Sequence, residues 1–303
     1  MLITEIGNWS NLVRDCPPLW LPQWAKRFGE AGLLVGGGVM APVVIRRNGD
    51  RTHVSSPPGE VGMCWASDPS RDHVDPSGLL RALHELGATS AFLKSDPYLS
   101  ELVTELPVVE LGASVEVIAN QFSVNEMIER AEDRRRIWSA ISDWPIELLT
   151  GPKASAVRSE FCAAYDQTMA KTGLTMSPSD FDELVRDDRT FVIVVRTPDG
   201  QFASAEMVMT NGKYGHVPFG VSADEFRKQS PSVKSLAFAI YLAADRGVVK
   251  LNLGGGLEPG DRLEWWKLRF GSCSLVPQNA VRWSIDGQES TETIPFPEWL
   301  EAA

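Results

Sequence analysis

The fold of this chain is decided by the stretch Asp245-Arg246-Gly247-Val248-Val249-Lys250-Leu251-Asn252-Leu253-Gly254-Gly255. A helix that begins at Ser230-Pro231 runs to Ala244, and Gly247 stands where a helix commonly ends in the left-handed conformation. The apolar residues Val248–Leu253 then predict a short buried strand, and the glycines after them predict a loop. A helix that leads through a glycine into a buried strand indicates a mixed α/β unit.

The same order of elements occurs once more, nearer the N-terminus. A helix over Leu79–Leu86 leads into a strand over Ala88–Lys94, which stops at Asp96-Pro97. A strand, turn and strand over Phe191–Arg196 and Phe202–Thr210 add antiparallel pairing. No sequence repeat accompanies this order, but it predicts the α/β class with mixed sheets (α+β).

The length of 303 residues favours two domains of roughly 150 residues each, with a single large α/β domain as the alternative. Ser123 and Glu126 fit a capping box that opens a helix through about Ile141, and this helix ends before Pro145. We therefore place the domains at residues 1–148 and 149–303.

Composition limits the partners of the chain. No apolar run approaches the roughly 20 residues of a membrane span, so no membrane partner is expected. The N-terminus lacks the basic and apolar regions of a signal peptide, which makes the cytoplasm the expected compartment. A net charge of −11 disfavours a broad grip on nucleic acid, although a local basic patch is compatible with it.

The cysteines Cys16, Cys64, Cys162 and Cys273 lie far apart, without a CxxC pair or a histidine at ligand spacing. Buried thiols are the expected interpretation, with neither a metal site nor a disulfide framework. No GxSxG elbow is present, so covalent catalysis is not expected. We expect no cofactor.

Further segments surround the opening stretch in a consistent order. They are Lys94-Ser95-Asp96-Pro97-Tyr98, Arg134-Arg135-Arg136-Ile137, Tyr165-Asp166-Gln167-Thr168 with Lys171 and Gly173, Phe181, Asn211-Gly212-Lys213-Tyr214, and Leu263-Glu264-Trp265-Trp266-Lys267-Leu268-Arg269-Phe270-Gly271. Together, over residues 88 to 283, they resemble the Fem family of aminoacyltransferases, two-domain enzymes of the GNAT fold superfamily.

This resemblance implies tandem GNAT-like domains, with the acceptor side in residues 1–148 and the acyl-donor side in residues 149–303. It implies the 3′ end of an aminoacyl-tRNA as donor and an amine as acceptor, with Lys267 and Asp96 as catalytic residues. The substrate-binding residues that it implies are Tyr214, Asn252, Gly254, Gly255, Trp265, Trp266, Arg269, Lys94 and Arg136.

The residue types suit direct attack of an amine on an activated acyl group. The ammonium of Lys267 can stabilise the oxyanion or bind a donor phosphate, and Asp96 can take the proton of the attacking amine. The competing interpretations are a solvated helix lysine and a simple turn at Asp96-Pro97.

Aromatic and basic side chains give the remaining candidates. Trp265 and Trp266 can stack on a terminal adenine, although core packing is expected for at least one of them. Arg136 and its arginine neighbours, with Arg269, are candidates for phosphate contacts or simply for a solvated helix face. The glycines Gly254 and Gly255 allow a close approach of substrate to the backbone or only a turn.

Two departures from the family narrow the acceptor. No heptad run of a helical hairpin occurs between Tyr165 and Lys267, and the first 88 residues match no known segment. A small-molecule amine is therefore expected rather than a peptidoglycan precursor. An acyl-CoA donor is the alternative, but the Gln/Arg-x-x-Gly-x-Gly/Ala loop that would bind its pyrophosphate is missing. A non-catalytic scaffold of the same fold is the third hypothesis.

Overall fold

The computed structural model describes residues 1–12, 22–36, 38–57, 64–65, 76–95, 108–119, 124–129, 132–170, 175–255 and 260–285. Contacts among these residues group them into two compact units. Unit 1 holds the described residues of Met1–Ser114 with 276–285, and unit 2 holds those of Val115–Leu275. The domain boundary placed near residue 148 from the sequence stays a prediction.

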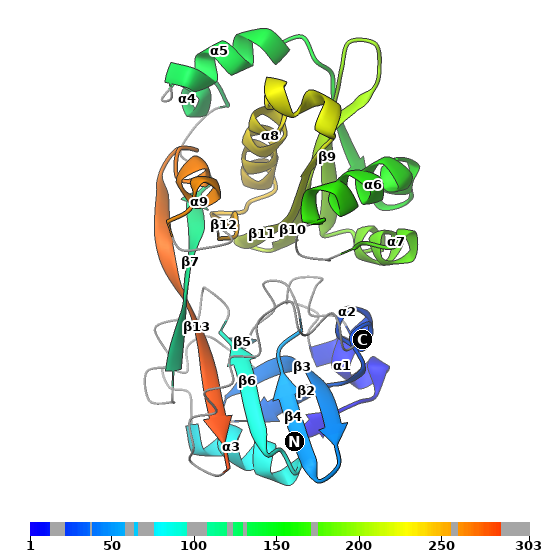
Figure 1. Cartoon of the computed structure of the whole chain (residues 1–303), viewed down its shortest axis with the longest axis vertical. Coiled ribbons are helices and arrows are strands. Elements are labelled where there is room, and N and C mark those ends of the chain that lie inside the picture. Colours follow the sequence, from blue (N-terminus) through cyan, green and yellow to red (C-terminus); the bar gives the residue numbers. More distant parts are fainter. Residues whose placement is uncertain are drawn as a thin grey trace. The chain divides into compact units, whose positions relative to one another are not determined.

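Unit 1 is built on a sheet with the strand order β1-β2-β3-β4-β6-β13, and β5 pairs with β3 (Figure 1). The pair β4 and β6 is parallel and the other pairs are antiparallel. The elements are β1 Leu2–Ile3, α1 Ile6–Leu12, α2 Pro22–Lys26, β2 Glu30–Gly36, β3 Val39–Asn48, β4 Arg51–Ser55, β5 Cys64–Trp65, α3 Pro76–Glu85, β6 Ser90–Lys94 and β13 Cys273–Ser284.

Unit 2 is built on a sheet with the order β7-β12-β11-β10-β9-β8, in which β11 and β12 are parallel and the other pairs antiparallel. Its elements are β7 Val108–Ile118, which starts in unit 1, α4 Val124–Glu129, α5 Glu132–Ile141, β8 Ile146–Thr150, α6 Arg158–Met169, α7 Pro178–Arg186, β9 Thr190–Arg196, β10 Phe202–Asn211, β11 Tyr214–Ser222, α8 Ser232–Asp245, β12 Lys250–Asn252 and α9 Arg262–Lys267, with short 3-10 helices at Gly151–Val157 and Asp224–Gln229.

The strands of the two units repeat one topology. Each runs through antiparallel strands to a parallel pair, and each parallel pair gains its second strand directly after a helix, α3 before β6 and α8 before β12. Gly87 and Gly247 follow these helices with φ angles of +71° and +85°, the left-handed conformation expected from the sequence. The mixed α/β fold predicted from the sequence is confirmed.

One helical prediction changed in detail. The single helix expected to run to about Ile141 is described as two helices, α4 and α5, with residues 130–131 outside the described part. Among the described residues, no helix has both the length and the apolar character needed to cross a membrane.

Cys162 is buried in α6, where desolvation, with Asp166 as the next cause, raises the pKa of its thiol to about 11.

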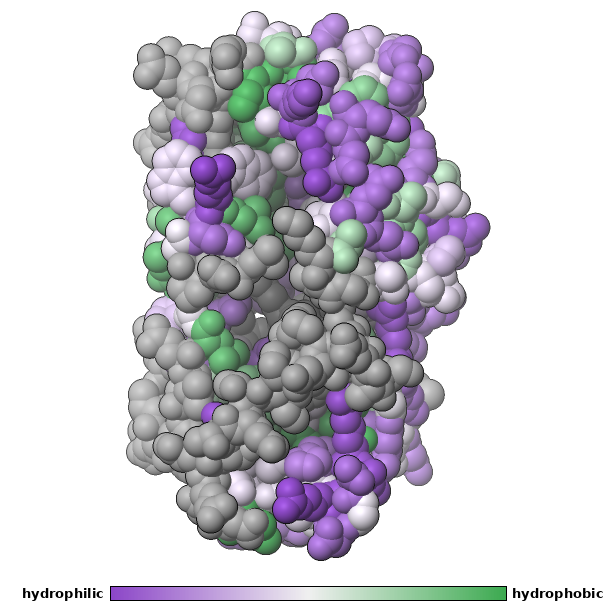
Figure 2. Space-filling model, viewed as in Figure 1, coloured by the Kyte–Doolittle hydropathy of each residue, from purple (hydrophilic) through white to green (hydrophobic). Residues whose placement is uncertain are grey.

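Helices cover both faces of the unit 2 sheet. Figure 1 shows α8 on one side of the strands and α6 and α7 on the other. The core against α8 includes Val208 and Ile240, and on the other side Phe161 packs against Phe181 with ring centroids 5.0 Å apart. Hydrophilic residues gather over the outer face of α6 and α7 (Figure 2). This layering fixes β10 and β11, which carry part of the candidate site.

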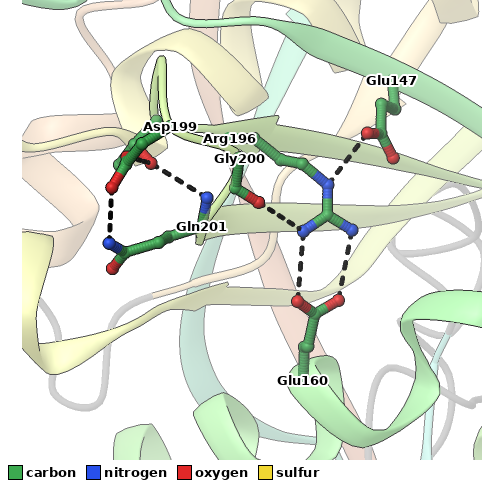
Figure 3. Close-up of polar contacts among 7 residues, drawn as sticks. Glu147, Glu160, Arg196, Asp199, Gly200 and Gln201 are labelled. Atoms are coloured by element: carbon green, nitrogen blue, oxygen red, sulfur yellow. Dashed lines mark hydrogen bonds and ion pairs between the residues drawn. The ribbon is translucent and has the colours of Figure 1, made fainter.

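Arg196 secures the hairpin between β9 and β10 (Figure 3). Its guanidinium donates from Nε to Glu147 Oε1 at 2.8 Å and from Nη1 and Nη2 to the two oxygens of Glu160 at 3.1 and 3.2 Å. Nη1 also donates to the carbonyl oxygen of Gly200 at 3.2 Å. The hydrogen bonds to Glu160, then the charges of both carboxylates, raise the pKa of Arg196. One side chain thus joins β8, α6 and the turn that leads into β10.

Candidate active site

The parallel pair of unit 2 opens where β12 ends. β11 has nine residues and β12 has three, and their pairing runs from Tyr214 opposite Lys250 to His216 opposite Asn252. From Val217 to Ser222, β11 continues without pairing to β12. An unpaired strand edge leaves backbone groups that can bind an extended ligand.

A β-bulge lies at this opening. Met207 pairs with Phe219 and Met209 pairs with His216, so Val208 of β10 faces two residues of β11, Val217 and Pro218. A bulge bends its strand and leaves a residue unpaired, and proline is tolerated there because the ladder needs no N–H from an unpaired residue. The bend therefore starts at the residue where β11 leaves β12.

The chain turns sharply after β12. Asn252 is buried, and its Oδ1 accepts a hydrogen bond from the backbone nitrogen of Gly254 at 2.6 Å. Gly254 has a φ of +75°, a conformation that favours glycine. The Gly254 carbonyl oxygen accepts from the backbone nitrogen of Val115 at 3.2 Å, which fixes the loop against β7.

Lys267 is held over this loop. It is the last residue of α9, and its Nζ donates to the carbonyl oxygen of Gly255 at 2.9 Å. The other end of α9 is capped by Asp261, which accepts from the backbone nitrogen of Glu264 at 2.8 Å. Asn252, Gly254, Gly255 and Lys267, all predicted from the sequence, therefore come together.

A buried carboxyl group faces the same opening. Glu206 on β10 is only 5% exposed, and its Oε1 accepts a hydrogen bond from Ser235 Oγ of α8 at 3.3 Å. Ser235 Oγ also lies 3.2 Å from Ser204 Oγ. Desolvation raises the pKa of Glu206 to about 8, while the positive charge of Lys267 and the Ser235 hydrogen bond work in the opposite direction.

Gly220 makes room for this carboxyl group. It pairs with Glu206 across the ladder between β10 and β11, on the part of β11 that extends past β12. A Cβ at this position would lie 2.3 Å from Glu206 Oε2, which no real contact allows. The carboxyl group can occupy its place only because residue 220 has no side chain.

Helix α8, which carries Ser235, is anchored by Lys234, the residue that precedes Ser235 in the same helix. The Nζ of the buried Lys234 donates to the carbonyl oxygens of Ile141 at 3.0 Å, Ser142 at 2.8 Å and Trp144 at 2.7 Å. Burial lowers the pKa of this ammonium group. The three bonds tie α8 to the end of α5 and hold Ser235 in place.

The two tryptophans of α9 have different surroundings. Trp265 is 58% exposed, and the guanidinium carbon of Arg269 lies 4.5 Å from its ring centroid. Trp266 packs against the core, edge-on to Phe270 at a centroid distance of 4.9 Å. Core packing of one of the pair was expected, and Trp266 is that residue.

The remaining predicted residues lie elsewhere or outside the described part. Tyr214 begins β11 and is 43% exposed, two residues before the pairing with β12 stops. Lys94 ends β6 in unit 1. Asp96 lies outside the described residues, as does the side chain of Arg136 on α5. Their roles stay predictions.

Sequence reasoning missed Glu206. A signal was present, because it is the one charged residue in the otherwise apolar or small run from Phe202 to Met209. Acidic residues are rarely fully buried without a partner. Its relation to Lys267 depends on strand pairing, which the spacing of residues did not reveal.

The fold that these elements define is the tandem GNAT-like fold. The structure is similar to that of FemX, with a TM-score of 0.63 and 13% identity over 91% of this chain and 95% of that one. It is equally similar to L-PGS from Bacillus licheniformis, with a TM-score of 0.63 and 10% identity over 98% of both chains. The C-terminal domain of a putative lysylphosphatidylglycerol synthetase from Agrobacterium fabrum gives a TM-score of 0.62 and 14% identity over 93% and 92%.

At the level of sequence, neither a family model nor a curated protein matches the chain. The structural likeness therefore establishes the fold alone, which this chain shares with the three structures over nearly its whole length.

Proposed function

We propose that this protein is an acyltransferase that forms an amide bond on a small-molecule amine, with the 3′ end of an aminoacyl-tRNA as the acyl donor. The observation that supports this most directly is the opening between β11 and β12, where Lys267 is hydrogen bonded to Gly255 O and its positive charge acts on the buried carboxyl group of Glu206. An ammonium beside an unpaired strand edge is suited to a carbonyl that gains negative charge during transfer.

The reaction needs no covalent enzyme intermediate. The acceptor nitrogen attacks the acyl carbonyl carbon, the new C–N bond forms, and the ester bond to the ribose oxygen of the donor breaks. Lys267 stabilises the oxyanion formed between these events. The amine gives up one proton, for which Asp96 is the predicted acceptor, and the departing ribose oxygen takes one up.

The helices of unit 2 support a small acceptor. Between Tyr165 and Lys267, the described helices of more than two turns are α7 with 9 residues and α8 with 14 residues. Neither has the length of the helical hairpin expected in members that act on peptidoglycan precursors. The acyl-CoA alternative keeps the same chemistry, with a thioester bond broken in place of the ester.

The test is transfer from a mixture of radiolabelled aminoacyl-tRNAs to a panel of small amines, with and without ribonuclease and with acyl-CoA in parallel. Labelled amide that disappears after ribonuclease treatment is the expected result. Transfer that survives ribonuclease, or that occurs from acyl-CoA alone, would assign the donor to the alternative. No transfer from either donor contradicts the acyltransferase proposal.

A further inference from the structure

The carboxyl group of Glu206 is only half used by the fold. Ser235 is the hydrogen-bond donor to its Oε1, and among the described residues no donor reaches Oε2. Oε2 is the oxygen that approaches Gly220, on the part of β11 that lies beyond the end of β12. A side chain that is 95% buried thus has one oxygen directed to the open end of the strand pair.

Folding alone does not account for this residue. Burial of a carboxyl group is unfavourable, and the other residues of this strand from Phe202 to Met209 are apolar or small. A glycine inside a strand also lowers stability relative to alanine. Gly220 and Ser235 both accommodate Glu206, so two further positions serve one acidic group.

The chemistry of the cluster favours a cation that donates hydrogen bonds. A cation bound at Oε2 favours the ionised form of Glu206, which only accepts hydrogen bonds, and the hydroxyl groups of Ser204 and Ser235 can accept as well. A small ammonium group can donate hydrogen bonds to all three of these acceptors. In an aminoacyl donor, the α-ammonium sits on the carbon next to the reacting carbonyl, so its binding site must lie close to the group that stabilises the oxyanion. The charge of Lys267 acts on Glu206, which is consistent with that closeness.

We infer that Glu206 binds the α-ammonium group of the transferred aminoacyl residue and so selects donors with a free α-amine. This inference rests on the proposed function and deepens it: acetyl and fatty acyl groups lack the ammonium. Glu206 is then a specificity-determining residue of the donor site, and Gly220 and Ser235 position its carboxylate.

The probe is a donor that keeps the size of the aminoacyl group and loses its charge. An α-hydroxyacyl-tRNA, made by deamination of the aminoacyl-tRNA that the protein uses, meets this requirement. A hydrogen bond to a charged group contributes about 1.5–3 kcal/mol, so the wild-type protein should use the α-hydroxyacyl donor with a kcat/KM about 10- to 150-fold lower. In Glu206→Gln, kcat/KM for the aminoacyl donor should fall by a similar factor and the two donors should become equal within a few-fold.

The matched control is Glu160→Gln on α6, whose carboxylate pairs with Arg196 and should leave the donor preference unchanged. A Glu206→Gln variant that keeps the wild-type preference overturns the inference. An equal loss with both donors overturns it as well, because that result indicates a proton-transfer or structural role. Wild-type protein that uses both donors equally contradicts it without any variant, so the test does not depend on the folding of Glu206→Gln. Absence of all transfer is a different result and contradicts the proposed function instead.

Discussion

The parallel strand pairs of the two units share one topology and end in different ways. In unit 1, β4 and β6 remain bonded to their ends: the backbone nitrogen of Ser56 donates to Phe92 O at 2.9 Å, and that of Lys94 donates to Ser56 Oγ at 2.9 Å. In unit 2, pairing stops at His216 opposite Asn252, and β11 continues through a bulge. A strand pair that is closed in one unit is open in the other.

The open pair of unit 2 is the place in this repeated topology where a ligand can bind. A closed pair satisfies its own backbone groups, whereas an open pair leaves them for a ligand. Unit 2 also has two ionisable groups at its opening, the buried carboxyl group of Glu206 and the ammonium of Lys267. From this comparison we expect changes in unit 2 to affect transfer and matched changes in unit 1 to affect stability or affinity.

The largest expected effect comes from removing the ammonium at the open pair. Lys267→Ala should lower kcat for transfer by about 10²–10³-fold, the usual cost of losing one oxyanion-stabilising donor. Lys94→Ala, at the closed pair, should mainly raise KM by a few-fold. Steady-state kinetics with the donor that the transfer assay identifies measure both effects. Lys213→Ala, on the exposed turn before β11, is the control. Equal losses of kcat in Lys267→Ala and Lys94→Ala would break the comparison.

The buried carboxyl group should make stability depend on pH. The pKa of Glu206 is raised from 4.5 to about 8, so between these values the folded protein keeps a proton that the unfolded chain releases. The free energy of unfolding therefore falls as pH rises from 4.5 to 8, because the unfolded state binds fewer protons in that window. Glu206→Gln removes this contribution, and relative to wild type it should gain on the order of 3 kcal/mol between pH 5 and pH 8.

Denaturant unfolding of both proteins at pH 5, 6, 7 and 8 measures this gain. The difference between the two proteins cancels the groups that titrate in both. A difference that stays constant over this range would contradict a carboxyl group that stays protonated in the folded state.

Some parts of the candidate site could be predicted from the sequence and others could not. The helix that ends at Gly247, the strand after it and the loop at Gly254 are set by local backbone preferences, and they were predicted within a few residues. The resemblance led to Lys267, and the structure places it 2.9 Å from the Gly255 carbonyl oxygen.

The opening itself could not be predicted, because it depends on which residues of two strands face each other. The bulge at Val217 and Pro218 exists only relative to Val208 of β10, and Glu206 meets Gly220 only through the same ladder. A one-residue change of register would move Glu206 to the other face of the sheet. Local sequence patterns do not show where the bulge shifts that register, so the carboxyl group of the site was missed.

Alanine substitutions at two glycines, one in each unit, should have smaller effects that again differ between the units. A Cβ at Gly220 would lie 2.3 Å from Glu206 Oε2, and a Cβ at Gly36 on β2 would lie 2.6 Å from the backbone oxygen of Gly78 in α3. Gly220→Ala should lower kcat/KM about tenfold with a small change in stability, because a side chain can move aside. Gly36→Ala should lower the free energy of unfolding by about 1–3 kcal/mol, because a helix backbone must move, with kcat per folded molecule retained. Activity per folded molecule and denaturant unfolding, measured on both variants, separate the two outcomes, and a reversed pattern would contradict the division of roles.

The smallest expected effect concerns the exposed indole of Trp265. A base stacked on an aromatic side chain contributes about 1–3 kcal/mol, and Arg269 already lies on the Trp265 ring, so we take the lower limit. Trp265→Ala should raise KM for the donor about fivefold with kcat unchanged, and its 58% exposure predicts little loss of stability. Tyr241→Ala on α8, an aromatic side chain of 45% exposure, is the matched control and should leave KM unchanged. An unchanged KM in Trp265→Ala would exclude the stacking role and leave the donor site to Lys267, Glu206 and the open strand edge. A KM that rises for aminoacyl-tRNA, but not for a minimal aminoacyl ester without adenine, would locate the contact at the terminal base.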